Sequence, residues 1–234
     1  LARDNEVWGV ARFTAEGSRE RSETIGVRTH SADLADGNLS DLPDDFTHLV
    51  HFAVWQGRTL DHDRAIRANA EATGLVMAHC RNAEAALVAS TNSVYRAHED
   101  PWHSYVETDP LGDATAPHSP NYGVSKVSQE AVARTMARVL GLPTTIARIN
   151  ASYGPNGGLP AYHADWVATG EPVWLRAPGP NPYSPIHEED MTNQLAPLLD
   201  AASTPATIVN WCGDEVVTAE DWVDLFGQHL GVDP

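Results

Sequence analysis

Short apolar runs alternate with longer amphipathic segments along the first two thirds of the chain. The apolar runs are short enough for buried strands, and they lie at Glu6–Ala11, Ile25–Thr29, His48–Val54, Ala85–Ser90 and Thr144–Ile149. The segments Asp61–Cys80 and Tyr122–Leu140 have the length and spacing of helices. Strands that alternate with helices predict an α/β fold with a doubly wound parallel sheet, covered by helices on both faces.

The last third of the chain, from Tyr153 onward, contains more Gly and Pro and shorter elements. Helices are predicted there at Ala161–Thr169, Glu188–Ala202 and Ala219–Leu230. We therefore predict that residues 1–152 form the sheet domain and that residues 153–234 mainly form a smaller C-terminal lobe over it. Three lesser elements complete the prediction: the end of a helix at Leu1–Asp4, a short helix at Leu39–Leu42, and a long loop at Arg96–Pro120. Loops of that length are usually functional or mobile.

A crevice is expected where the predicted strands end, because ligands of open parallel sheets bind beyond the carboxyl ends of the strands. Residues at or just after these ends are Ala11, Asp33, Ala53, Thr91 and Asn150. The helix that follows the long loop begins with Tyr122 and also contains Lys126. Residues four apart lie one turn from each other on the same helix face. Lys126 is the only lysine in the chain, which has fourteen arginines. The spacing alone is common, and a solvated helix face would explain it as well.

Composition and charge exclude several classes of partner. The formal charge of −17 leaves no basic footprint for nucleic acid or an anionic membrane. No apolar run approaches the ~20 residues of a membrane-spanning helix, and no signal peptide is expected. The histidines show no spacing typical of zinc ligands, so no metal site is predicted. Cys80 and Cys212 are far apart in sequence and are expected to be free thiols of a cytoplasmic protein.

Several short motifs occur in the order that one protein family shows. They are Asp33-Leu34, His51-Phe52-Ala53, Asn69, Ser90-Thr91 with Val94-Tyr95, Tyr122-Gly-Val-Ser-Lys126, Arg148, Tyr153-Gly154-Pro155 and Ile186-His187 with Asp190. With these motifs the chain resembles an extended short-chain dehydrogenase/reductase of the NAD(P)-dependent epimerase/dehydratase family. The resemblance covers nearly the whole chain and implies a Rossmann-like fold with a C-terminal substrate lobe.

The resemblance also implies roles for individual residues. Tyr122 would exchange a proton with the substrate oxygen, Lys126 would favour the phenolate and hold the cofactor ribose, and Thr91 would fix the substrate oxygen. The residues expected at the cofactor are Arg12, Asp33, Leu34, Phe52, Ala53, Asn69, Ser90, Tyr122, Lys126 and Ile149. Those expected at the substrate are Thr91, Ser93, Asn150, Tyr183 and His187. For some of them an ordinary structural role is the alternative: a turn for Asp33, a helix surface for Asn69, a backbone contact for Thr91.

Two departures from the family pattern concern the cofactor. The family's Gly-x-x-Gly-x-x-Gly turn would precede the first strand, so we expect either that roughly two dozen family positions are missing from the printed chain or that it is a fragment. The C-terminus is likewise expected to stop early. The end of the first strand holds Ala11 and Arg12, where an NAD-preferring member has an acid. A guanidinium there can bind a 2′-phosphate, which favours NADP over the alternative NAD.

Two further departures concern the substrate. Asn92 and Ser93 stand where the dehydratases have an Asp-Glu pair, so 4,6-dehydration is not expected. Ala151 and Tyr183 stand where nucleotide-sugar enzymes usually have a diphosphate-binding Asn and Arg, which indicates a smaller or less anionic substrate. Asn150, one position before Ala151, is expected to substitute in part for the missing Asn.

The sequence therefore predicts an NADP-dependent oxidoreductase that acts on a secondary alcohol or ketone. The alternatives are a nucleotide-sugar 4-epimerase and a non-catalytic dinucleotide-binding relative. The resemblance also implies a homodimer formed through Asp61–Cys80 and Tyr122–Leu140, a small-molecule substrate, and neither nucleic-acid nor membrane binding.

Overall fold

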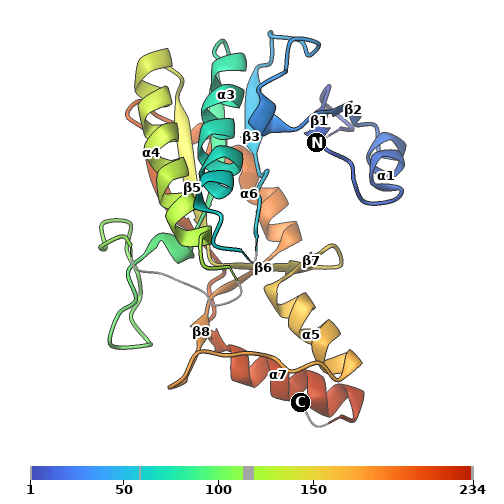
Figure 1. Cartoon of the computed structure of the whole chain (residues 1–234), viewed down its shortest axis with the longest axis vertical. Helices are drawn as coiled ribbons and strands as arrows, with labels where there is room; N and C mark the ends of the chain where they lie inside the picture. Colours follow the sequence, from blue (N-terminus) through green and yellow to red (C-terminus); the bar gives the residue numbers. More distant parts are fainter. Residues whose placement is uncertain (1, 58, 113–118, 233–234) are drawn as a thin grey trace.

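A four-stranded parallel sheet forms the centre of the molecule (Figure 1). The computed structural model describes residues 2–57, 59–112 and 119–232. The sheet has the order β10-β5-β4-β3, with bounds Thr207–Trp211, Thr144–Ile149, Ala85–Thr91 and His48–His51. All seven residues of β4 are buried, which is expected for a central strand covered on both faces. The predicted parallel sheet is confirmed.

Helices cover both faces of this sheet. One face is covered by α4 (Tyr122–Leu140) and by a second helical run made of α2 (His62–Ile66), the π-helical turn η2 (Arg67–Glu71) and α3 (Ala72–His79). Figure 1 shows α3 and α4 side by side. The other face is covered by α6 (Glu188–Asp200), which contacts β4 and β5. Both long helices lie where the sequence predicts them, and α4 has the predicted bounds.

A separate parallel pair, β1 (Trp8–Ala11) and β2 (Arg28–Ser31), is joined by α1 (Ser18–Thr24). We call residues 8–31 the N-terminal unit. The predicted strand at Ile25–Thr29 is wrong in position, because α1 ends at Thr24 and Gly26 turns the chain with a φ of +89°. Ile25 is accordingly 71% exposed. The sequence did not predict α1 because it is entirely polar and has no apolar face.

The C-terminal lobe contains α5 (Leu159–Thr169) and α7 (Ala219–Leu230), near the predicted positions. The N-terminus of α7 has a capping box between Thr218 and Asp221, which satisfies backbone N–H groups that the first turn leaves free. Short strands connect the lobe to the sheet: β6 (Ala151–Gly154), β7 (Gly157–Gly158), β8 (Pro182–Tyr183), β9 (Pro185–His187) and β11 (Val217–Thr218).

One strand was not predicted, and three predicted elements differ from the structure. The sequence missed β10, which belongs to the predicted lobe yet pairs with β5 inside the sheet. Leu39–Leu42 is not helical, although both leucines are buried, and the nearby helical turn is η1 (Leu34–Asp36). Ala2–Asp4 forms a turn rather than the end of a helix, and Leu1 lies outside the described residues. The predicted strand His48–Val54 stops at His51, so Phe52 and Ala53 lie beyond it.

Within the described residues, no helix has the length and hydropathy needed to cross a membrane. Cys80 and Cys212 are both free thiols, as expected from their sequence positions.

Candidate active site

The hydroxyls of Thr91 and Tyr122 meet at the carboxyl edge of the sheet. Thr91 is the last residue of β4, and its side chain accepts a hydrogen bond from the Ser93 N–H, which begins the 3-10 turn η3 (Asn92–Val94). Tyr122 is the first residue of α4. The side chains of Thr91 and Gln56 lie beside the Tyr122 hydroxyl, and both act to lower the pKa of this phenol. The structure therefore brings the predicted acid–base residue and the predicted substrate-positioning hydroxyl together.

Burial raises the pKa of the Tyr122 phenol, and the neighbouring polar side chains of Thr91 and Gln56 act in the opposite direction. A phenol with a raised pKa holds its proton at neutral pH. Tyr122 is therefore in the state needed to donate a proton to a carbonyl oxygen. To accept a proton it needs further stabilisation of the phenolate.

Lys126 lies one turn further along α4 and is only 3% exposed. Its Nζ donates a hydrogen bond to the Ala89 carbonyl oxygen at 2.7 Å. Burial lowers the pKa of the ammonium from 10.5 to about 8, although the nearby carboxylate of Glu130 acts to raise it. The Tyr122 hydroxyl thus lies beside Thr91 and Gln56, while the Lys126 ammonium is directed at the backbone of β4.

Glu130 belongs to a buried polar network below Lys126. Arg148 binds both carboxylate oxygens of Glu130, with Nε–Oε1 and Nη2–Oε2 distances of 2.9 and 2.8 Å. Ser90 donates to the same Oε1 at 2.6 Å. The two ionised side chains are 1% and 3% exposed. Each charge is therefore paired, so Glu130 serves as a fixed negative charge beside Lys126.

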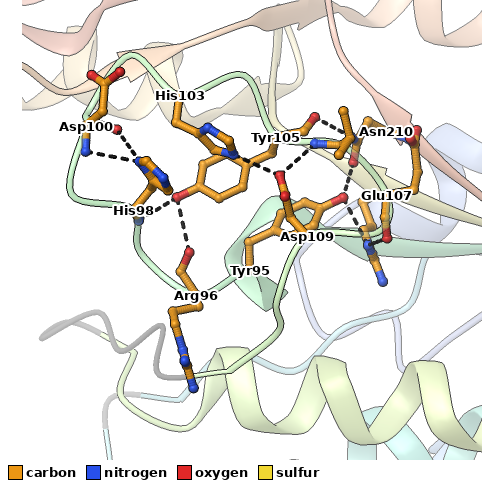
Figure 2. A network of polar contacts seen from close by, with 11 residues as sticks. Tyr95, Arg96, His98, Asp100, His103, Tyr105, Glu107, Asp109 and Asn210 are labelled. Carbon is orange, nitrogen blue, oxygen red and sulfur yellow. Dashed lines mark hydrogen bonds and ion pairs between the residues drawn. The ribbon is translucent and has the colours of Figure 1, made fainter.

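The loop after η3 folds into an ordered hairpin over the edge of the sheet, as Figure 2 shows. The rings of Tyr95 and Tyr105 stack at 4.9 Å, and those of His98 and His103 stack at 4.0 Å. The His103 Nε2 lies 2.8 Å from Asp109 Oδ2. The described part of the predicted loop, residues 96–112 and 119–120, therefore includes a compact structure. Residues 113–118 lie outside the described part.

This hairpin is attached to the ends of β5 and β10. The Tyr95 hydroxyl donates to Asn210 Oδ1 at 2.5 Å and accepts a hydrogen bond from Arg148 Nη1 at 2.9 Å. Asn210 in turn donates to the Tyr105 carbonyl oxygen at 2.8 Å (Figure 2). The loop is thereby connected to the same arginine that pairs with Glu130 below Lys126.

The predicted cofactor residues occupy different kinds of position. Phe52 and Ala53 are exposed beyond the end of β3, and Arg12 is exposed directly after β1. Ile149 is half-buried in the sheet core. Leu34 packs on the main core cluster, and the Asp33 carboxylate caps η1 by accepting the Ala35 N–H at 3.0 Å. Asp33 thus has the turn role that the sequence left open as its alternative.

Two other predicted cofactor residues are hydrogen-bonded to protein partners. Ser90 bonds to Glu130, as described above. Asn69 is completely buried in the π-helical turn η2. It pairs with both the N–H and the carbonyl of Trp55, at 2.7 and 2.9 Å, and donates to Ser125 Oγ at 2.9 Å. In this structure Asn69 holds the loop between β3 and α2, and it is not the helix-surface residue of the alternative interpretation.

The predicted substrate residues are spread along the junction between the sheet and the lobe. Asn150 Oδ1 accepts the Ser184 N–H at 3.2 Å, which ties the end of β5 to the segment beside Tyr183. The Tyr183 ring packs against Trp222 of α7 at 5.3 Å and is part of the lobe core. His187 caps the N-terminus of α6 through the Glu189 N–H. Ser93 lies beside Thr91.

Sequence reasoning missed Gln56 and Glu130. Glu130 follows Lys126 by four residues on α4, and that spacing on one helix face was an available signal. Gln56 follows the motif His51-Phe52-Ala53 in a loop, where no local pattern indicates what a side chain will contact. Among the described residues, no cluster of His, Cys, Asp or Glu is arranged to hold a metal ion.

Comparison with known proteins agrees with this architecture. A sequence profile described as the NAD dependent epimerase/dehydratase family matches residues 1–209, and the chain belongs to that family of enzymes. No protein with a curated description matches the chain. The fold is the Rossmann-like α/β fold of solved epimerase and dehydratase structures.

Three of these solved structures are representative. MoeE5 in complex with UDP-glucose and NAD is 24% identical, with a TM-score of 0.78 over 98% of this chain and 75% of that one. The UDP-glucose 4-epimerase of Thermotoga maritima with UDP-glucose is 18% identical, with a TM-score of 0.77 over 99% and 77%. The dTDP-glucose 4,6-dehydratase DesIV of Streptomyces venezuelae with NAD bound is 24% identical, with a TM-score of 0.78 over 97% and 72%.

Proposed function

We propose that this enzyme transfers a hydride between a nicotinamide dinucleotide and a secondary alcohol or ketone, with Tyr122 as the acid–base residue. The observation that supports this best is the contact between Thr91 and the Tyr122 hydroxyl at the carboxyl edge of β4. That arrangement presents two hydroxyls to one substrate oxygen, which positions the oxygen and gives it a proton donor.

The residues around the crevice fit a dinucleotide. Phe52 and Val54 expose 42% and 47% of their surface just beyond the end of β3, where a flat apolar group can pack. Lys126 offers a buried ammonium that can bind ribose hydroxyls, and Arg12 offers an exposed guanidinium. The bound nicotinamide would supply the hydride chemistry. Tyr122 would hold or release the proton at its hydroxyl oxygen, and Thr91 would orient the substrate oxygen.

We further propose that NADP is preferred, with NAD as the alternative. Arg12 is exposed at the end of β1, and Ala11 before it has no carboxylate to repel a 2′-phosphate. The solved relatives are described with NAD, which supports the alternative. Asp33 follows the end of β2, the strand that pairs in parallel with β1, but its carboxylate is bonded to the Ala35 N–H.

The second candidate is a nucleotide-sugar 4-epimerase. It is supported by the solved structures of similar fold, whose descriptions include UDP-glucose, UDP-glucuronic acid and UDP-N-acetylmuramic acid. Asn92 and Ser93 argue against dehydration in this chain, since neither is an acid. The family resemblance also supports a homodimer through Asp61–Cys80, the segment of α2, η2 and α3, and through Tyr122–Leu140, which is α4. Measurement of the mass in solution tests it. The Tyr122–Lys126 pair argues against a non-catalytic relative, and the cytoplasmic location stays a prediction.

The first experiment is a fluorescence titration of the protein with NADPH and, separately, with NADH. We expect tighter binding of NADPH, because Arg12 can pair with the extra phosphate. In Arg12→Ser, NADPH binding should weaken while NADH binding stays the same. Preference for NADH in the parent protein would contradict the NADP proposal and favour the epimerase.

A carbonyl screen with the preferred cofactor then tests the reaction. Tyr122→Phe should reduce turnover by about 10²–10⁴-fold, because it removes the proton donor and keeps the ring. Its cofactor affinity and thermal unfolding serve as controls and should stay close to those of the parent. Equal turnover in the parent and in Tyr122→Phe would refute the role of Tyr122.

A further inference from the structure

The buried charged side chains of the molecule lie together next to the proposed reaction centre. Among the described Lys, Arg, Asp and Glu residues, only Lys126, Glu130 and Arg148 are buried. We propose that Glu130 is a positioning residue, whose carboxylate keeps the Lys126 side chain charged and in place. The inference rests on the proposed function, in which a charged Lys126 stabilises the Tyr122 phenolate and holds the cofactor ribose.

Lys126 and Glu130 extend from neighbouring turns of α4 to neighbouring residues of β4. They are four residues apart, so they share one face of the helix. The Lys126 Nζ donates to the Ala89 carbonyl oxygen at 2.7 Å. The Glu130 Oε1 accepts a hydrogen bond from Ser90 Oγ at 2.6 Å. Both side chains are buried, so the ammonium and the carboxylate lie close together with little solvent to screen their attraction.

The Glu130 carboxylate is held in one orientation by three hydrogen-bond donors. Arg148 Nε and Nη2 bind its two oxygens at 2.9 and 2.8 Å, and Ser90 Oγ donates to Oε1 as well. An arginine side chain stays protonated in proteins, so its pairing keeps the Glu130 carboxylate ionised. The same contacts fix the position of the negative charge, and a fixed negative charge in turn holds the ammonium beside it.

The other ionisable groups around α4 in the described part of the chain do not offer Lys126 a buried negative charge. His51 of β3 is buried, but burial and the nearby Lys126 charge lower its pKa from 6.5 to about 4, so it is neutral when Lys126 titrates. His79 of α3 is half-buried and lies 2.8 Å from the Pro43 carbonyl oxygen. Neither β4 nor η3 has an ionisable residue. The other charged residues of the helical run and of α4 are exposed: His62, Asp63, Arg64, Arg67, Glu71, Arg134 and Arg138.

The charge of Lys126 therefore depends on Glu130. Burial brings the pKa of the Lys126 ammonium down to about 8, and the Glu130 carboxylate acts to raise it. Without that carboxylate the ammonium would have only the Arg148 guanidinium as a buried charged neighbour, and a like charge favours loss of the proton. Lys126 would then be largely a neutral amine at neutral pH, and a neutral amine does not stabilise the Tyr122 phenolate.

Titration of Lys126 in variants of both partners tests the proposal. The chain has only one lysine, so protein that contains carbon-13-labelled lysine gives a single Cε resonance, which reports the protonation of Lys126. Glu130→Gln should lower the titration midpoint by about one to two pH units. Arg148→Met keeps the carboxylate and removes the competing cation, so it should raise the midpoint. Glu71→Gln, which changes an exposed carboxylate of η2, is the matched control and should leave the midpoint unchanged.

Opposite shifts distinguish this role from a general loosening of the core, in which water enters and both midpoints rise towards 10.5. Such a shared rise, or an unchanged midpoint in Glu130→Gln, would overturn the proposal. If Glu130→Gln does not fold, the double variant Glu130→Gln/Arg148→Met replaces it, since neither charge is left unpaired. Its midpoint should lie below that of the parent, because the lost carboxylate is one helical turn from Lys126 whereas the lost guanidinium comes from β5. A midpoint at or above that of the parent would reject the proposal.

The pH profile of carbonyl reduction separates this inference from the proposed function. If both hold, the alkaline limb of turnover in Glu130→Gln should move to lower pH together with the Lys126 midpoint. If the midpoint shifts as expected but no carbonyl is reduced, the role of Glu130 stands and the proposed function fails. If a carbonyl is reduced and the midpoint does not respond to Glu130→Gln, the function stands and the role of Glu130 fails.

Discussion

The N-terminal unit and the four-stranded sheet are both parallel α/β structures, but they are stabilised differently. No described residue before Leu39 is buried, whereas every residue of β4 is. The ion pairs follow the same division. Arg19 and Glu23 pair at 3.0 Å with side chains 51% and 48% exposed, and Arg148 and Glu130 pair at 2.8 Å with 1% and 3% exposed.

This difference has a consequence for the site. The groups closest to the proposed chemistry, Thr91, Tyr122 and Lys126, all belong to the buried sheet and to α4. Arg12, which is proposed to select the cofactor, belongs to the exposed unit. The side chains that exchange the proton are thus expected to be held rigidly. The side chain that would bind the cofactor phosphate is expected to be more mobile.

Replacing the glutamate of each ion pair with glutamine should give the largest contrast in the free energy of unfolding. Glu130→Gln leaves the Arg148 guanidinium buried without a matching charge, so the free energy of unfolding should fall by about 3–5 kcal/mol. Denaturant unfolding measures it. Adding Arg148→Met to Glu130→Gln removes the unpaired charge and should recover part of the loss. A fall no larger than that of a surface substitution would show that water reaches this pair.

The protonation of Lys126 should change the free energy of unfolding with pH, by an amount between the effects of the buried and the exposed ion pair. Its pKa falls from 10.5 in the unfolded chain to about 8 in the folded protein. Between these values the unfolded chain binds more protons, so the contribution of Lys126 to the free energy of unfolding rises with pH by about 3 kcal/mol.

Comparison with Lys126→Met isolates that contribution, because the other groups that titrate in this pH range are the same in both proteins. The difference in unfolding free energy between the two proteins should change with pH from about 8 to about 10.5, in favour of the parent at the upper end. Parallel stability profiles over this interval would mean that the folded Lys126 titrates as an ordinary lysine.

The smallest effect is expected at the surface pair. Glu23→Gln, the counterpart of Glu130→Gln, removes a charge that solvent already screens. Its unfolding midpoint should agree with that of the parent within the error of the measurement. A clear loss would indicate that the contacts of Glu23 with Arg19 and Thr29 hold α1 on β2 more firmly than their exposure implies.

Elements with a strong local sequence pattern could be predicted. The other elements depend on contacts between distant segments, which the sequence pattern does not show. The bounds of α4 and β5 match the prediction, because the first has a full amphipathic pattern and the second is a β-branched run between turn signals. The strand β10 was missed although Thr207-Ile-Val is also β-branched, since its role depends on pairing with the distant β5. The polar helix α1 has no apolar face, and only the Arg19–Glu23 spacing pointed to it.

The sequence by itself determined the parallel α/β class, the family and the Tyr122–Lys126 spacing, because these depend on local periodicity and on short motifs. Only the tertiary structure decided which groups surround the Tyr122 hydroxyl. Thr91 comes from β4, Gln56 from a loop held by Asn69 and Asn121, and the charge beside Lys126 is balanced by Arg148 from β5. Burial and contacts between distant segments set the ionisation of these groups, and neither is present in the pattern of neighbouring residues.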